Sequence, residues 1–130
     1  MTPDSLPSLS IIIPALNEEH GIGNIVERVL AAGAELQKMG VACLEVIVVD
    51  DGSHDGTAAV VEALMAPEKQ HSSRGAVRLL RHSQNRGYGA ALKTGLAEAD
   101  GDLIAFLDAD GTYPPEYFPQ LCRQALLQDL

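Results

Sequence analysis

Residues 44–57 read LEVIVVDDGSHDGT, an apolar run that stops abruptly at two aspartates and a glycine. Consecutive rather than alternating β-branched residues are typical of a strand covered on both faces, as in parallel sheets. Three more apolar runs, at residues 9–13, 77–80 and 103–107, are each followed by a polar or glycine-rich segment. Because stretches with helical periodicity separate the runs, the sequence predicts an α/β fold. We expect four strands in a doubly wound, mostly parallel sheet with flanking helices.

Helical spacing of apolar residues follows each predicted strand. The first helix is expected to begin at Asn17 or just after it and to end at Gly40, which can adopt the left-handed backbone of a helix end. Ser53 and Asp55 can cap the second helix. The periodic segments are residues 22–30, 60–65, 88–99 and, from Pro114 onward, 114–126.

Composition restricts the classes of protein and of partner. The chain has 130 residues, nine of them basic and eighteen acidic, so its net charge is -9, and 46% of its residues are hydrophobic. This length and apolar content suit a single domain over residues 1–130. Unclustered basic residues on an acidic chain argue against nucleic acid as a partner. Without a signal peptide or a long apolar run, we expect a soluble, cytoplasmic protein with Cys43 and Cys122 as buried thiols.

Unusual polar clusters follow the predicted strands, at the sheet edge where α/β proteins bind ligands. Asp108 and Asp110 leave a strand with one small residue between them, so a turn can direct both carboxylates to one point. Hard oxygen ligands suit Mg²⁺ or Mn²⁺, and a cation would allow a diphosphate to bind an acidic protein. An ordinary loop made of turn-forming residues would have the same sequence.

The other clusters are open to two interpretations each. Asp51 can accept hydrogen bonds from a ribose or a base, whereas Ser53 and Asp55 fit helix capping better. Residues 87–94 are rich in glycine and alanine, but Leu92 stands where both the dinucleotide motif and the P-loop need glycine, which favours close packing of a helix on the sheet. The cations best placed to approach a phosphate are Arg81, Arg86 and Lys93. The histidines, His20, His54, His71 and His82, share no metal-binding spacing and are expected to be solvated.

Four of these segments, in this order, resemble the amino-terminal part of the family 2 glycosyltransferases, which have the GT-A fold. The resemblance extends over most of residues 9–120, and the ending DADGTYPPE of residues 108–116 is most similar to the polyprenyl-phosphate branch, which includes the dolichol-phosphate mannosyltransferases. The segments that carry it are SIIIPALNE (residues 10–18), VIVVDDGSHDGT (46–57), NRGYGAAL (85–92) and GDLIAFLDAD (101–110).

The resemblance implies that a nucleoside-diphosphate sugar is the donor. It implies that Pro14, Leu16 and Glu18 line the nucleotide and that Val49 and Asp51 contact the base or ribose. Asp108 and Asp110 would be the catalytic pair that holds Mg²⁺ or Mn²⁺ and the diphosphate, with Ala109 between them. Two residues depart from the pattern, because Leu16 stands where relatives often have Tyr and Thr112 where mannosyltransferases often have Gln.

The implied reaction inverts the anomeric carbon, and the implied acceptor is a polyprenyl phosphate at the inner face of a membrane. The acceptor half would lie beyond residue 130, so these residues alone should bind nucleotide weakly and transfer sugar poorly. A receiver-type phosphoacceptor module and a noncatalytic nucleotide-binding fragment are the alternatives. An exposed edge on the fourth strand would favour a homo-oligomer.

Overall fold

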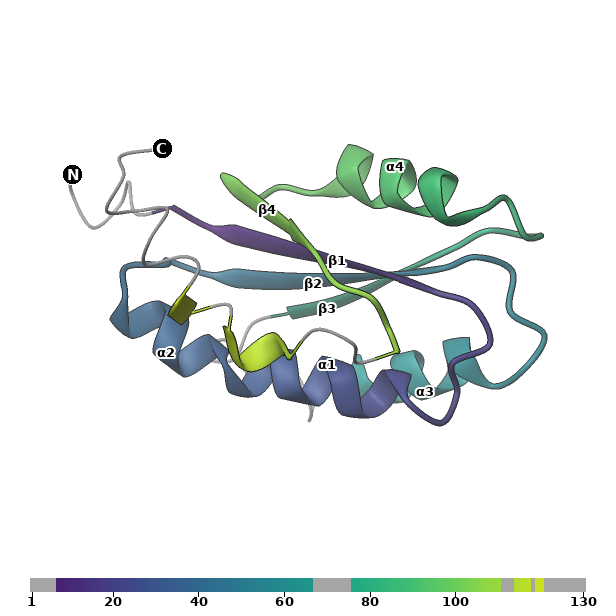
Figure 1. Ribbon diagram of the computed structural model, residues 1–130, viewed down its shortest axis with the longest axis horizontal. Coiled ribbons are helices and arrows are strands. Elements are labelled where there is room, and N and C mark those ends of the chain that lie inside the picture. Colours follow the sequence, from purple (N-terminus) through teal and green to yellow (C-terminus); the bar gives the residue numbers. More distant parts are fainter. Residues whose placement is uncertain (1–6, 67–75, 111–113, 118, 121–130) are drawn as a thin grey trace.

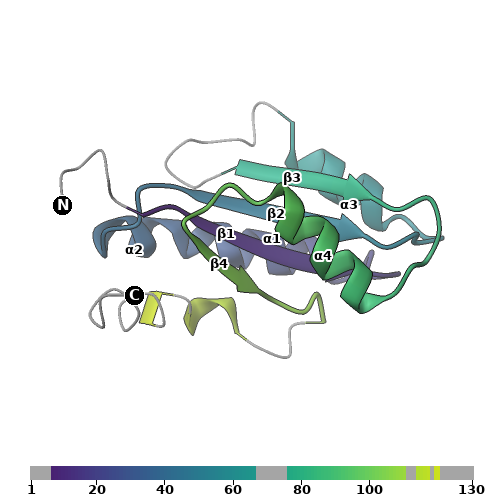
Figure 2. The same cartoon turned by 90° about the horizontal axis from the view of Figure 1, so that it is seen from above.

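The computed structural model describes residues 7–66, 76–110, 114–117 and 119–120. Its centre is a sheet of four parallel strands in the order β3-β2-β1-β4, as Figures 1 and 2 show. The strands are β1 (Leu9–Ala15), β2 (Leu44–Asp50), β3 (Ala76–Arg81) and β4 (Leu103–Phe106). Each contains most of one predicted apolar run, so the predicted α/β class and parallel sheet are confirmed.

Helices cover both faces of the sheet, as in a doubly wound fold. In Figure 1, α1 (Ile22–Ala31), α2 (Gly33–Lys38) and α3 (Thr57–Leu64) lie below the sheet, and α4 (Tyr88–Glu98) lies above it. The 3₁₀ helix η3 (Pro115–Tyr117) lies beside α1. Every residue of β1 is buried, because Ile11 and Ile13 face the larger cluster under α1 while Ile12 faces the smaller one under α4.

The first predicted helix is in fact two helices. The amide of Ala32 donates to the carbonyls of both Arg28 and Val29, and Gly33 then begins α2. Glycine is a poor helix former, which favours a break at this point. Asn17 is not the cap of α1, since the cap residue is Gly21 and Asn17 has a left-handed backbone with φ 52°. Gly40 does end α2, because the amides of Gly40 and Val41 return to the carbonyls of Gln37 and Leu36.

Residues 88–94 belong to α4, with Gly87 as its cap, and the helix packs closely on the sheet, as the glycine and alanine content predicts. Ala91 is fully buried, and a Cβ atom on Gly95 would lie 2.5 Å from Cγ2 of Ile12. The helix therefore lies close over β1 and β2 and leaves β4 to its side (Figure 2).

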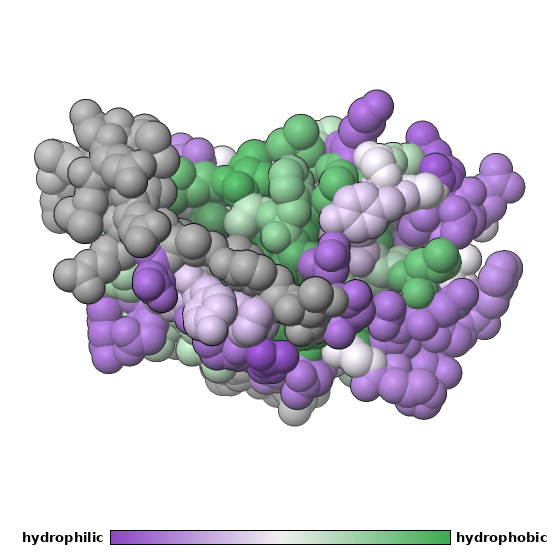
Figure 3. Space-filling model, in the orientation of Figure 1, coloured by the Kyte–Doolittle hydropathy of each residue, from purple (hydrophilic) through white to green (hydrophobic). Residues whose placement is uncertain are grey.

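Two places on the surface expose side chains of a kind that is usually buried. Cys43 is exposed just before β2, so the prediction of a buried thiol is wrong for this residue, and Cys122 lies outside the described residues. On β4, Ile104 and Phe106 are 39% and 49% exposed; Phe106 pairs with Ile12, so both lie on the same face of the sheet as α4, beside the strands that the helix covers. Figure 3 shows hydrophobic residues gathered in this region. None of the described helices is long and apolar enough to cross a membrane.

Candidate functional site

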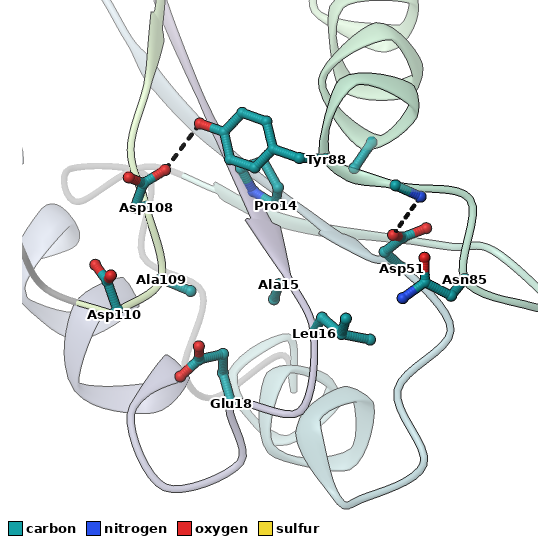
Figure 4. Close-up of a pocket in the computed structure, with 12 residues that line it drawn as sticks. Pro14, Ala15, Leu16, Glu18, Asp51, Asn85, Tyr88, Asp108, Ala109 and Asp110 are labelled. Atoms are coloured by element: carbon teal, nitrogen blue, oxygen red, sulfur yellow. Dashed lines mark hydrogen bonds between the residues drawn. The ribbon is translucent and has the colours of Figure 1, made fainter.

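A cavity of about 450 Å³ lies at the carboxyl ends of β1, β2 and β4, where α4 begins (Figure 4). The parallel register explains its position, because Ala15 pairs with Asp50 and both strands end at the same level. The cavity is lined by Pro14, Ala15, Leu16, Glu18, Asp51, Asn85, Gly87, Tyr88, Ala91, Asp108, Ala109 and Asp110.

The structure thus brings together all the residues that the family resemblance implies for the nucleotide and the metal, except one. Val49 does not line the cavity, because its side chain is fully buried under α4 with Ile12 and Ile47. Asn85 and Tyr88 line the cavity although they were not predicted as site residues. Both lie in the segment 85–92 that carries the family resemblance, which was the available signal.

Asp108 and Asp110 are exposed, whereas Ala109 between them is buried. This alternation places both carboxylates on the same side of the cavity, as Figure 4 shows. The phenol of Tyr88 donates a hydrogen bond of 2.8 Å to Oδ1 of Asp108, which joins the start of α4 to the segment after β4. This hydrogen bond, together with burial and the two negative charges, raises the pKa of Tyr88 above its ordinary value.

The donor atoms suit a hard divalent cation. Asp108, Asp110 and Glu18 supply carboxylate oxygens around the same cavity, and such ligands bind Mg²⁺ or Mn²⁺. Within the described part of the chain, no three His, Cys, Asp or Glu side chains are grouped closely enough to hold an ion by themselves. A cation held by two of these carboxylates would complete its coordination with water or phosphate oxygens.

All charged residues among the described lining residues are acidic. Four carboxylates line the cavity, and none of the described lining residues is Lys or Arg. Arg81 instead lies near Asp50 and Glu62, at 3.8 and 3.6 Å, on the side of α3. Arg86 and Lys93 also lie outside the lining, so the three predicted phosphate-approaching cations are not brought to the cavity.

Asp51 is buried at the wall of the cavity, with 4% of its surface exposed. Its Oδ1 accepts hydrogen bonds from the amide of Arg86 and from Nδ1 of His82, and its Oδ2 accepts one from the amide of Gly87. Burial alone would raise the pKa of Asp51, but the hydrogen bonds from His82 and the two amides outweigh it and hold the pKa below its ordinary value. Asp51 is therefore ionised at neutral pH.

His82 is buried, with 9% of its surface exposed, so the prediction of a solvated imidazole is wrong. It follows β3 directly, its amide bonds to the carbonyl of Asp50, and its ring is held between Asp51 and Thr94. The adjacent polar residues suggested solvent exposure, but the contact with Asp51 spans 31 residues and leaves no local pattern.

The loop after β1 is fastened to the loop after β2 by hydrogen bonds in both directions. Ser53 does not cap α3, because its hydroxyl accepts from the amide of Asn17. Asp55 does accept from the amide of Thr57 at the start of α3, as predicted, and it also accepts from the amide of Glu19. The remaining links are His54 N to Asn17 Oδ1 (2.9 Å), Glu18 N to Thr57 Oγ1 (2.8 Å) and Gly56 N to Glu19 Oε2 (3.0 Å).

Gly52 permits a close contact between the loop after β2 and the loop after β3. Its φ is +78°, and a Cβ atom there would lie 2.5 Å from the carbonyl carbon of Gln84 and 2.6 Å from the amide nitrogen of Asn85. Only glycine allows this approach, which brings residues 85–87 against Asp51.

Comparison with known proteins identifies the class to which this fold and cavity belong. The model of glycosyl transferase family 2 matches residues 10–126, and the chain belongs to this family. The expected GT-A fold is confirmed, and the match excludes the receiver-type alternative.

Individual relatives agree with this assignment. The chain is 39% identical over 126 residues to an undecaprenyl-phosphate 4-deoxy-4-formamido-L-arabinose transferase of Sodalis glossinidius, covering 95% of this chain and 35% of the relative. A mannosyltransferase of Pyrobaculum calidifontis, solved with GDP-Man and Mn²⁺, superposes with a TM-score of 0.65 at 30% identity, over 88% of this chain and 31% of the other.

A glucosyl-3-phosphoglycerate synthase of Mycobacterium tuberculosis, solved with Mn²⁺, UDP and phosphoglyceric acid, gives a TM-score of 0.58 at 26% identity. The match includes 82% of this chain and 34% of the synthase. The chain spans about a third of the length of the curated relatives it matches.

Proposed function

We propose that residues 1–130 form the nucleotide-sugar-binding domain of an inverting glycosyltransferase that uses a divalent cation and a polyprenyl-phosphate acceptor. The observation that carries the proposal is the cavity at the carboxyl ends of the strands, which has four carboxylates and no basic side chain among its described lining residues. An anionic diphosphate could bind there only with a cation to reverse the local charge.

Different sides of the cavity would bind different parts of the donor molecule. Asp108 and Asp110 would hold Mg²⁺ or Mn²⁺, and Ala109 would lie under the diphosphate. Pro14 and Leu16 offer an apolar surface to the base or ribose, and Leu16 is 39% exposed. A carboxylate has about four acceptor positions. Three donors from the protein leave Asp51 one acceptor position for an N–H or O–H group of the nucleotide.

The chemistry follows from the charges of donor and acceptor. A bound divalent cation stabilises the negative charge that develops on the departing diphosphate. An oxygen of the acceptor forms a bond to the anomeric carbon as the bond from that carbon to the diphosphate breaks, and attack from the opposite side inverts the configuration. A lipid phosphate is already anionic, so no strong general base is required from this chain.

The names of the relatives support the proposed acceptor. The Sodalis relative is named as an undecaprenyl-phosphate transferase. We propose the inner face of a membrane as the place of the reaction. Because these residues cover about a third of that relative, we expect the isolated chain to bind nucleotide weakly and to transfer sugar poorly or not at all.

Self-association remains a prediction from β4. This strand lies at an edge of the described sheet and exposes Ile104 and Phe106, which favours pairing with another chain. Sedimentation should show dimers or larger species as concentration rises. A monomer at every concentration would contradict this prediction.

Calorimetry tests the proposed function. The chain should bind UDP or GDP in the presence of Mn²⁺, and the heat of binding should disappear when the metal is chelated or when Asp110 is replaced (Asp110→Ala). Asp102→Ala is a matched control, because Asp102 binds Ser8 at the opposite end of β4 and lies away from the cavity. Binding that is independent of the metal, or unchanged in Asp110→Ala, would refute the proposal.

A further inference from the structure

A buried chain of hydrogen bonds connects the wall of the cavity to α4. The side chains of His82 and Asp51 are 5% and 6% exposed, and their Nδ1 and Oδ1 atoms are 2.7 Å apart. On the other side of the ring, Nε2 lies 2.8 Å from Oγ1 of Thr94. Thr94 is not among the lining residues, so the chain begins at the cavity and ends on the helix behind it.

The donors along this chain can be assigned from Asp51. An ionised carboxylate only accepts hydrogen bonds, so Nδ1 of His82 must carry the proton that Oδ1 receives. In the neutral imidazole, Nε2 is then the acceptor, and the hydroxyl of Thr94 donates to it. Each atom of the chain has a partner with the right role, and none of the buried side-chain polar atoms described is left unsatisfied.

The carboxylate of Asp51 is held by three protein donors, of which His82 supplies the side-chain one. The amides of Arg86 and Gly87 approach Asp51 at 2.9 Å each from just before α4, and the imidazole holds Oδ1 from the position directly after β3. Without the imidazole, a buried charge would lose its side-chain donor, and leaving a buried charge short of partners is costly. The carboxylate would then turn toward solvent in the cavity, which is the space the nucleotide would occupy.

We propose that His82 is a positioning residue for nucleotide binding: donation from Nδ1, supported by Thr94 behind the ring, holds Asp51 in the orientation that receives the base or ribose. This inference rests on the proposed function for its ligand, but not for its geometry. It adds a residue that touches no nucleotide and that sets the affinity through Asp51.

The first experiment needs no ligand. Nitrogen NMR of the full 130-residue chain should show His82 with its proton on Nδ1. In His82→Ala the amide resonances of Arg86 and Gly87 should shift, whereas in His82→Asn, whose amide nitrogen can replace Nδ1 as donor, they should stay near the wild-type positions. His20→Ala is the matched control, because the side chain of His20 is 97% exposed. A proton on Nε2 with none on Nδ1, or unchanged Arg86 and Gly87 amides in folded His82→Ala, would overturn the inference.

The second experiment measures the Kd of UDP and GDP with Mn²⁺ at a temperature where each variant is folded. Loss of a hydrogen bond to a charged group should weaken binding roughly 10-fold or more in His82→Ala, with partial loss in Thr94→Val and recovery in His82→Asn. A role confined to stability would lower the melting temperature of His82→Ala and leave the Kd of the folded protein unchanged, which would overturn the inference. If the wild type binds no nucleotide, the proposed function fails, and the NMR experiment still decides whether His82 orients Asp51.

Discussion

Replacing Gly52 by alanine tests whether the contact between the loops after β2 and β3 builds the cavity. The alanine must adopt φ near +78°, and left-handed backbone costs an L-residue about 1–2 kcal/mol. Its Cβ atom would also meet backbone atoms of Gln84 and Asn85 at 2.5 and 2.6 Å, which are too close to be relieved by a side-chain rotation. Overpacking of this kind costs about 1–3 kcal/mol, so the free energy of unfolding should fall by roughly 2–5 kcal/mol.

Gly40→Ala separates the two contributions. Gly40 has φ +99° but no atom within 4 Å of the position of a Cβ, so its replacement should cost only the backbone term of about 1–2 kcal/mol. Both replacements reduce the entropy of the unfolded chain to a similar extent, and this effect cancels in the comparison. Urea unfolding followed by circular dichroism gives both values. Equal losses, within about 0.5 kcal/mol, would refute the argument that close approach at Gly52 holds the loops together.

Two further predictions concern ionisation. Tyr88 should titrate above its ordinary pKa, because its phenol donates a hydrogen bond to Asp108. In Asp108→Asn, the midpoint of the titration followed by tyrosine absorbance should move back toward pH 10. An unchanged titration curve would contradict the hydrogen bond. Stability should fall in acid. Burial raises the pKa of Asp51 and of Glu45, but hydrogen bonds lower each below its ordinary value. The contribution of these two carboxylates to the free energy of unfolding is therefore present above about pH 4. It is lost as the pH drops through their lowered pKa values in the folded state. Urea midpoints that stay constant from pH 6 to about pH 3 would contradict it.

The sheet could be predicted from the sequence because its evidence is local. Each strand is a consecutive apolar run that ends in polar residues, and parallel pairing then brings Asp51 and Asp108 to one edge without any knowledge of side-chain contacts. The break after Ala31 was less predictable, because apolar spacing continues through Leu36 and only Gly33 hints at the interruption.

The hydrogen-bond partners of the side chains at the site could not be predicted. His82 is buried only because it meets Asp51, and Ser53 serves Asn17 rather than the helix that follows it. A serine or histidine near a strand end can form hydrogen bonds with several nearby groups, and the tertiary structure determines which of these bonds forms. The motif therefore indicated which segments form the site but not which residues bind ligand and which fasten the loops.

The location of the cation tests the central claim most directly. Mn²⁺ added with UDP or GDP should broaden the NMR signals around Asp108–Asp110, Tyr88 and Glu18 first, because the ion would lie between these carboxylates. Signals around Glu45 and Ser10, at the opposite end of the strands, should remain sharp, and Asp110→Ala should abolish the selective broadening. Broadening that centres on other acidic residues, or that survives in Asp110→Ala, would contradict a metal-dependent nucleotide site at this edge of the sheet.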